Sequence, residues 1–337
     1  MLRRSFALVV LASATLSVSA CRAPASDGVR ERRELPAVSE SQLESLPPRA
    51  TPDPRKHAIG KRLFSDVRLS GDEKVSCVTC HLREFGYTDG RAKAPKMANR
   101  DAGTVNVPSL LNVAYDYRYN WSGQYLTLED QLDELIKRRG AMNTTWAVVV
   151  PRIAQDGDYQ ATFREVYPEG ITRTTIADAL LTYVRSLTTQ GSRFDRYQKG
   201  DLAALSEKEK EGLRYFKDYG CSSCHQGRNI GGNLLQRFGV VEDYFQSAKV
   251  RDRGGIQDPD FGLFNATKDE KDRFVFRVPS LRDVARTPPY FHDGSAETLE
   301  AAVATMAYYQ LGRQLSDHEL SAIVAFLHTL TGEEPSP

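Results

Sequence analysis

The chain has 337 residues, of which 40% are hydrophobic and 26% charged, a composition typical of a globular protein with about two domains. Its 45 basic and 44 acidic residues nearly cancel, so the sequence lacks the strong positive charge that is typical of nucleic-acid binding. The basic runs at 30–33 and 137–139 are best interpreted as solvated faces.

Residues 1–20 predict a lipoprotein signal peptide, because a basic start precedes an apolar run too short to span a bilayer as a mature helix. The run ends in VSAC, where cleavage would leave Cys21 as a lipidated N-terminus. The alternative is an ordinary signal peptide with an incidental cysteine. Arg22 indicates the outer membrane by the sorting rule for bacterial lipoproteins. Residues 21–55, rich in Pro, Ser, Arg and Glu, predict a flexible tether.

Two CxxCH motifs predict two covalently attached haem c groups, each with two thioethers from cysteine and one iron ligand from histidine. The motifs consist of Cys77, Cys80 and His81, and of Cys221, Cys224 and His225. The rival interpretations are a zinc site, which needs ligands from both distant motifs, and a redox pair, which does not require the histidine. With Cys21 assigned to lipid, all 5 cysteines have a role and none is left for a disulfide.

Hydrophobic periodicity predicts a mainly α fold with long loops. Residues 174–189 form an amphipathic pattern, and residues 316–330 begin with a capping box of Ser316 and Glu319. The longest loop is expected at roughly 226–275.

The chain repeats itself, since residues 107–129 align without gaps with 278–300 at an offset of 171. We therefore expect two cytochrome c-like haem domains in tandem, an N-terminal one over 56–195 and a C-terminal one over 196–337. The copies differ where Trp121 aligns with His292, Gln131 with Ala302, and Leu135 with Met306. These differences indicate two haems with different roles.

The motifs NWSGQYLTLEDQ, RTPPYFHDGS and MAYYQLGRQLS, together with the two CxxCH sites, resemble the bacterial dihaem cytochrome c peroxidases and the related MauG enzymes over about residues 56–333. The resemblance implies an electron-transfer haem in the C-terminal domain, with His225 and Met306 as its iron ligands. A thioether ligand raises the haem potential. MauG has tyrosine at this position, so Met306 favours the peroxidases. The alternative is that Met306 only fills the core.

The resemblance also implies a peroxide-reacting haem in the N-terminal domain, with His81 as its proximal ligand. Trp121 matches a tryptophan that relays electrons between the haems, and Gln131 matches a glutamine of the distal pocket. The alternatives are a buried core tryptophan and a solvent-facing helical glutamine.

The family further holds calcium between its domains, and the matching residues here are Asn106, Thr287 and Pro289. Oxygen donors suit this hard cation. His292 matches a histidine close to the haems, which we expect to bond a propionate.

The match fails at two points. Ala141 stands where the family has a glutamate that moves a proton during peroxide cleavage, and alanine cannot transfer a proton. The sequence does not decide among the replacements Glu134, Arg138, Arg139 and Asn143. The loop 82–120 contains no histidine to cap the N-terminal iron, since Ala98 occupies the aligned position, beside Met97. Tyrosines of the loop would need deprotonation to ligate the iron. We therefore expect an open N-terminal iron.

Three functions follow from these expectations. The first is reduction of hydrogen peroxide with electrons from a small donor protein, a cytochrome c or cupredoxin. The second is MauG-like oxidation of a partner protein, and the third is a non-catalytic dihaem electron carrier or sensor. We expect the protein in the periplasm of a Gram-negative bacterium, in contact with the outer membrane through its lipid only. No nucleic-acid partner is expected, and a homodimer is left open.

Overall fold

The computed structural model describes residues 43–94 and 104–334, within one compact unit of the chain, Ser41–Pro337. The predicted signal peptide, Cys21, Met97 and Ala98 lie outside the described residues. Within the described ranges, no helix is long and apolar enough to cross a membrane.

The fold is mainly helical, as predicted, with long connecting segments. The α-helices are α1 (Pro54–Phe64), α2 (Leu128–Lys137), α3 (Trp146–Ala154), α4 (Gly157–Arg164), α5 (Arg173–Ser186), α6 (Arg193–Gln198), α7 (Glu207–Asp218), α8 (Ala248–Asp252), α9 (Phe264–Thr267), α10 (Leu299–Leu311) and α11 (Asp317–His328). The described strands are two, β1 (Leu235–Arg237) and β2 (Val275–Arg277), which pair antiparallel with Gln236 opposite Phe276.

The two helices expected from periodicity are confirmed as α5 and α11. Helix α11 begins after Ser316, whose hydroxyl accepts from the backbone of Glu319 while the Glu319 carboxylate accepts from the backbone of Ser316. This capping box satisfies backbone N–H groups that a helix start leaves unpaired.

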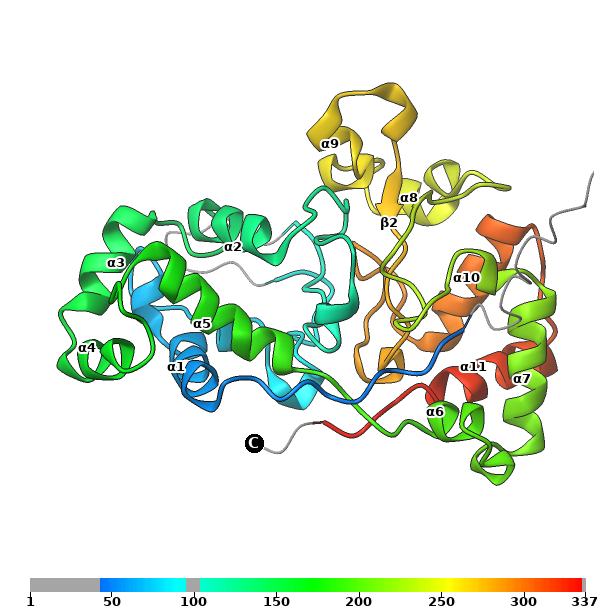
Figure 1. Cartoon of the computed structure of the whole chain (residues 1–337). Helices are drawn as coiled ribbons and strands as arrows, with labels where there is room; N and C mark the ends of the chain where they lie inside the picture. Colours follow the sequence, from blue (N-terminus) through cyan, green and yellow to red (C-terminus); the bar gives the residue numbers. More distant parts are fainter. Residues whose placement is uncertain (1–42, 95–103, 335–337) are drawn as a thin grey trace, which may run out of the picture. The chain divides into compact units, whose positions relative to one another are not determined.

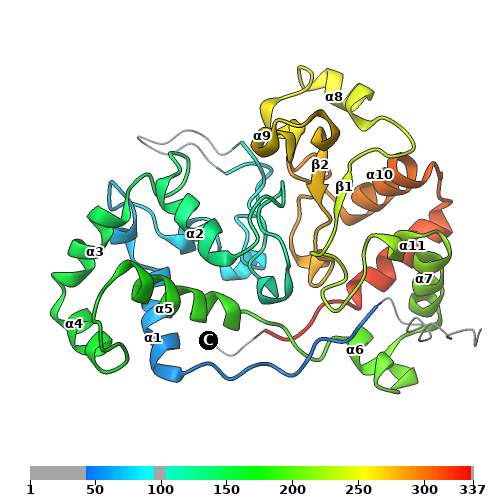
Figure 2. The ribbon, with the colours of Figure 1, turned by 45° about the horizontal axis from the view of Figure 1, so that its top comes forward.

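Each half of the chain is built on one close helix crossing, α1 on α5 and α7 on α11, which can be followed in Figures 1 and 2. A side chain at Gly60 would place its Cβ 1.9 Å from the Ala179 carbonyl oxygen, and one at Gly212 would place it 1.9 Å from that of Ala322. Glycine therefore permits the same crossing in both halves. Each crossing carries its own hydrophobic core, one formed within 59–187 and the other by Leu43 with residues from 194–330.

The sequence repeat is also a repeat of conformation. Helices α2 and α10 begin 171 residues apart, after the caps Thr127 and Thr298. Backbone bridges at the same offset pair Tyr119 with Tyr125 and Tyr290 with Ala296. The alignment of Leu135 with Met306 is therefore an alignment in space along two equivalent helices.

The segment 226–275, expected as a loop of the second copy, is folded around its own aromatic core. Strands β1 and β2 and the short helices α8 and α9 enclose Phe238, Tyr244, Phe245, Val250, Phe274 and Phe276. Trp121, Phe291, Met306 and Tyr309 pack against this cluster. The inserted segment therefore forms a wall beside the predicted iron ligand of the C-terminal domain.

Residues 43–53, expected to belong to the flexible tether, are instead packed on the protein. Leu43 is buried in the second core, and the backbone of Glu44 donates to Gly227. The tether was therefore predicted too long at its C-terminal end. Two leucines in this polar stretch, Leu43 and Leu46, are buried against the protein, and burial of their apolar surface stabilises the packed segment.

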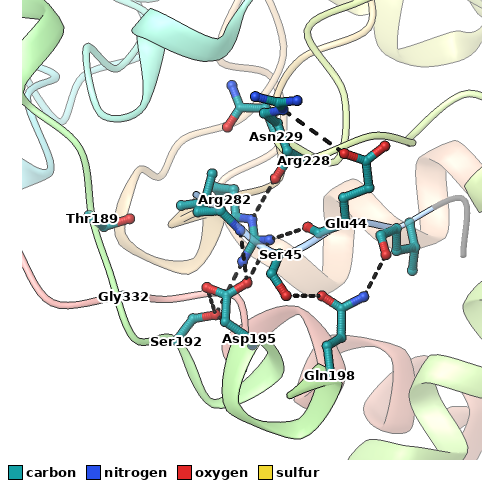
Figure 3. Close-up of polar contacts among 12 residues, drawn as sticks. Glu44, Ser45, Thr189, Ser192, Asp195, Gln198, Arg228, Asn229, Arg282 and Gly332 are labelled. Atoms are coloured by element: carbon teal, nitrogen blue, oxygen red, sulfur yellow. Dashed lines mark hydrogen bonds and ion pairs between the residues drawn. The ribbon is translucent and has the colours of Figure 1, made fainter. Parts of the chain in front are cut away.

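A buried arginine holds this segment in place (Figure 3). The guanidinium of Arg282 donates to the Glu44 carbonyl at 2.7 Å and pairs with Asp195 at 2.9 Å. It also donates to Ser192 Oγ and to the carbonyl of Arg228, three residues after the second CxxCH histidine. Its side chain has no solvent exposure, so it depends on these partners for compensation.

Candidate haem sites

In the first CxxCH motif, the orientation of the histidine leaves one ring nitrogen free to bind iron. Cys77 opens a short 3₁₀ turn, Cys77–Thr79, and His81 Nδ1 lies 2.9 Å from the Tyr87 carbonyl oxygen. A carbonyl oxygen only accepts, so Nδ1 carries the proton and Nε2 is left with its lone pair. Burial lowers the pKa of His81, which also favours the neutral imidazole that binds a metal.

The cysteines do not fit the rival interpretations. Burial raises the pKa of Cys77 to about 12 and that of Cys221 to about 11, whereas reactive redox cysteines have lowered values. Over 43–94 and 104–334, the one group of metal-ligating side chains within mutual reach is Asp260, His292 and Asp293. No zinc site formed by the two motifs is therefore present in this part of the chain.

The second motif opens onto a cavity that gathers most of the residues predicted for the C-terminal haem. Its lining includes the ends of the motif, the methionine and tryptophan, and the predicted calcium ligands: Cys221, Cys224, His225, Met306, Trp121, His292, Asn106, Thr287 and Pro289. Burial lowers the pKa of His225 to about 4, so its imidazole is neutral. One cavity therefore holds a neutral histidine and a thioether, the donor pair expected for a haem of this type.

The described part of the N-terminal domain has no thioether at the position equivalent to Met306. Leu135 occupies on α2 the position of Met306 on α10, seven residues after each helix begins. A leucine has no donor atom for iron, so the repeat-equivalent ligand is missing in this domain.

No histidine in the described part of the chain is positioned as a second ligand for the N-terminal iron. Those outside the CxxCH motifs are either paired with other residues or exposed. His57 Nε2 lies 3.0 Å from Ser186 Oγ, His318 pairs with Glu211, and His292 pairs with Asp260. His328 is exposed at the end of α11. Among the loop tyrosines, the Tyr119 hydroxyl donates to the Asp116 carbonyl.

Gln131 lies on α2 one turn before Leu135, and its Oε1 is buried without a hydrogen-bond partner among the described residues. A buried amide oxygen without a donor is costly, so this position suits a ligand that donates a hydrogen bond to it. Ala141 lies in the turn after α2, where its N–H donates to the Arg138 carbonyl. Glu134, Arg138, Arg139 and Asn143 stay candidates for its missing proton-transfer role.

Trp121 lies in the wall of the second cavity and is fixed at both ends. Its indole N–H donates to the Asn106 carbonyl at 2.8 Å, and its own carbonyl accepts from the backbone N–H of Arg277 at 2.9 Å.

The bond from Arg277 to Trp121 has a counterpart in the other copy. The backbone N–H of Asn106 donates to the His292 carbonyl at 2.7 Å, and both residues of this bond are offset by 171 from those of the first. The repeat-equivalent residues Asn112 and Asp283 also meet directly, at 2.8 Å, both buried. Equivalent residues of the two copies therefore make equivalent contacts across the interface between them, as in a dimer with two-fold symmetry.

His292 is held by the inserted segment. Its Nε2 lies 2.7 Å from Asp260 Oδ1, and Arg253 pairs with both Asp260 and Asp293. The predicted propionate bond is left to Nδ1 and stays a prediction. Arg253 pairs with both carboxylates and His292 bonds Asp260, so the members of this acidic group have partners without a metal ion.

The predicted calcium residues line one cavity, and the side chains of Asn106 and Thr287 already make hydrogen bonds within the protein. Asn106 Nδ2 donates to the carbonyl oxygens of Arg91 at 2.8 Å and Pro289 at 3.3 Å. An ion here would need the amide to present its oxygen instead. Asp89, whose Oδ1 accepts from the backbone N–H of Arg91, is 5% exposed, and its Oδ2 is buried without a partner among the described residues. This orphan carboxylate oxygen fits a hard cation.

Comparison with known proteins points to one family. The model of the di-haem cytochrome c peroxidase family matches residues 54–203. The cytochrome c551 peroxidase of Nitrosomonas europaea is 37% identical over 279 residues, 82% of this chain and 80% of that protein. The cytochrome c peroxidase Ccp of Escherichia coli is 34% identical over 298 residues, 88% of this chain. This chain spans 62% of that relative's length.

A solved structure is similar to this protein in fold. A MauG-like protein associated with microbial copper homeostasis superposes with a TM-score of 0.72 at 28% identity, covering 89% of this chain and 95% of that one.

Proposed function

The chain belongs to the family of dihaem cytochrome c peroxidases, and from this premise we propose that it reduces hydrogen peroxide to water at the N-terminal haem with electrons delivered through the C-terminal haem. One peroxide molecule takes up two electrons and two protons to give two waters, so two one-electron donors are oxidised per turnover. The haem irons supply this redox chemistry when bound.

The observation that carries the proposal is the difference between two equivalent helices. Met306 on α10 shares a cavity with His225, whereas α2 has Leu135 in its place. A ligand on both sides of the iron suits electron transfer, and one free side suits binding of peroxide. The chain thus supports one haem of each kind.

The residues around the N-terminal haem then have separate tasks. His81 would hold the haem iron through Nε2, since its Nδ1 is bonded to the Tyr87 carbonyl. Gln131 Oε1 would accept a hydrogen bond from peroxide in this pocket, because that oxygen has no donor among the described residues. Trp121 links this side to the C-terminal cavity that it lines. Proton transfer falls to a residue other than Ala141.

We place the protein in the periplasm, anchored to the outer membrane through lipid on Cys21. A cytochrome c or cupredoxin there would supply electrons one at a time. These assignments rest on the sequence motifs at the N-terminus and on the family.

Steady-state oxidation of a reduced small cytochrome, followed optically after peroxide is added, tests the proposal on the holoprotein. We expect turnover that depends on both substrates and is lost in His81→Gly. Absence of turnover with several donors, despite two intact haems, would favour the electron carrier instead.

A MauG-like oxidation of a partner protein is the second candidate, favoured by the similarity to a MauG-like structure. Mass spectrometry of candidate partners after peroxide treatment distinguishes it, since a covalently oxidised partner residue would appear only under this alternative.

We also propose a calcium ion near Asn106, Thr287 and Pro289, with Asp89 as the charged oxygen donor. Titration calorimetry with calcium should show binding to the wild type that weakens at least tenfold in Asp89→Asn. Asp201→Asn is the control, since Asp201 is an exposed carboxylate in the other half of the chain. Equal calcium affinity in all three proteins would exclude Asp89 as a ligand.

A further inference from the structure

Trp121 is held by a buried polar network that reaches it from the C-terminal half of the chain. The network begins at Arg277, the last residue of β2, whose backbone N–H donates to the Trp121 carbonyl. The guanidinium of the same residue donates through Nε to the carbonyl of Asn120 at 3.2 Å. One residue thus fixes two successive carbonyls of the loop that carries the indole.

The guanidinium is in turn fixed by Asp116, five residues before the tryptophan. Arg277 Nη1 lies 2.7 Å from Asp116 Oδ2, and the two side chains are only 9% and 7% exposed. Arg277, Asp116 and Trp121 all line the cavity that contains His225 and Met306. The ion pair therefore lies where a small displacement would move the indole relative to that cavity.

Asp116 connects this pair to the loop after the second CxxCH motif. Its Oδ1 accepts from Asn229 Nδ2 at 2.6 Å, and Asn229 is four residues beyond His225. Ser280 Oγ holds the Asn229 carbonyl at 2.8 Å. The path from the His225 loop to Trp121 thus runs through Asn229, Asp116 and Arg277 without a break.

We propose that Arg277 and Asp116 are positioning residues for Trp121, which set the rate of electron transfer between the two haems without themselves carrying the electron. This inference rests on the proposed relay role of Trp121. The planar fork of arginine makes both contacts at fixed angles, whereas a lysine ammonium on a flexible stem cannot hold Asn120 and Asp116 together. Charge alone is therefore insufficient, and geometry is the property that matters.

The test measures interhaem transfer directly in the holoprotein. The C-terminal haem is reduced by one electron, peroxide is added in a stopped-flow instrument, and reoxidation of that haem is followed. The midpoint potentials of both haems are measured in each variant, so that a change in driving force is separated from a change in geometry.

We expect Arg277→Lys and Asp116→Asn each to slow reoxidation by roughly 10- to 100-fold, the range typical of lost outer-sphere support, with unchanged potentials. Asp195→Asn is the matched control, because it also breaks a buried arginine–aspartate pair (Figure 3), and the partners of the Asp195 side chain among the described residues are Arg282, Ser192 and Leu46 rather than Trp121. It should leave the rate unchanged.

Unpairing Asp116 or Arg277 leaves a buried charge, so a single variant can fail to fold. The double variant Asp116→Asn/Arg277→Met leaves neither charge unpaired and should show the same slow reoxidation. Trp121→Phe serves as the reference for loss of the relay.

The outcomes separate this inference from the proposed relay. Slow reoxidation in Trp121→Phe with normal rates in Arg277→Lys and in the double variant would overturn the positioning role and leave the relay standing. A normal rate in Trp121→Phe would overturn both. Equal slowing in Asp195→Asn would also overturn the inference, since it would show a general response to lost buried pairs.

Discussion

Asp195→Asn should destabilise the protein substantially, because it removes the charged partner of a fully buried guanidinium. Arg282 has 0% and Asp195 3% side-chain exposure, and Asp195 also accepts from the backbone N–H of Leu46. Burial lowers the pKa of Arg282, because a guanidinium removed from water is less stable in its charged form. The Asp195 carboxylate compensates this cost in the wild type.

Leaving one member of a buried pair uncompensated costs about 3–5 kcal/mol. Asparagine keeps one acceptor oxygen, so we expect a loss near the lower limit, about 3 kcal/mol in the free energy of unfolding. In a chain of this size each kcal/mol lowers the melting temperature by about 2 °C, which gives a fall of roughly 6 °C.

Thermal unfolding of the holoprotein, followed by circular dichroism at neutral pH, measures the change. Arg214→Gln is the control, because it breaks an exposed pair with Glu211 and should cost less than about 1 kcal/mol. The double variant Asp195→Asn/Arg282→Met should recover part of the loss. A melting temperature for Asp195→Asn equal to that of Arg214→Gln would refute the reasoning.

The remaining predictions concern the haems and one buried acid. Met306→Ala should abolish a near-infrared sulfur-to-iron band and lower the potential of one haem only; a wild type without this band would rule Met306 out as a ligand. Ala141→Glu should accelerate peroxide turnover, and a loss would mean that another residue already moves the proton. The oxidised protein should show one high-spin and one low-spin haem by EPR and react with peroxide without prior reduction, whereas two low-spin signals would mean that a side chain caps the iron held by His81. Burial raises the pKa of Asp283, so its contribution to stability is fully present below its unfolded pKa and is lost as the pH rises through the folded value; Asp283→Asn should flatten this part of the stability–pH curve measured by denaturant titration.

The sequence was informative where chemistry is local or repeated. Helices α5 and α11 follow from apolar periodicity and caps within a few residues. Met306 was expected beside His225 from the family resemblance, and both residues line one cavity. The difference between Leu135 and Met306 was visible in the sequence because the two copies align without gaps.

Contacts between distant segments left no such pattern. Arg277 and Asp116 are 161 residues apart, and His292 and Asp260 are 32 apart across an inserted segment with no counterpart in the first copy. The offset of 171 does place Arg277 opposite Asn106, the one signal that could have marked it. The packing of residues 43–53 was missed because composition reports average polarity, and two leucines suffice to anchor a short segment.

The reciprocal bonds from Asn106 to His292 and from Arg277 to Trp121 are made by main-chain atoms. Any amino acid except proline at positions 106 and 277 supplies the same N–H, and any at 121 and 292 the same carbonyl. These two bonds between the copies therefore do not depend on which side chain stands at the four positions, although the side chains of Arg277, Asn106 and His292 make further contacts of their own. An indole and an imidazole can thus stand at equivalent positions of the two copies, at 121 and 292, while the main-chain bonds that join the copies stay the same.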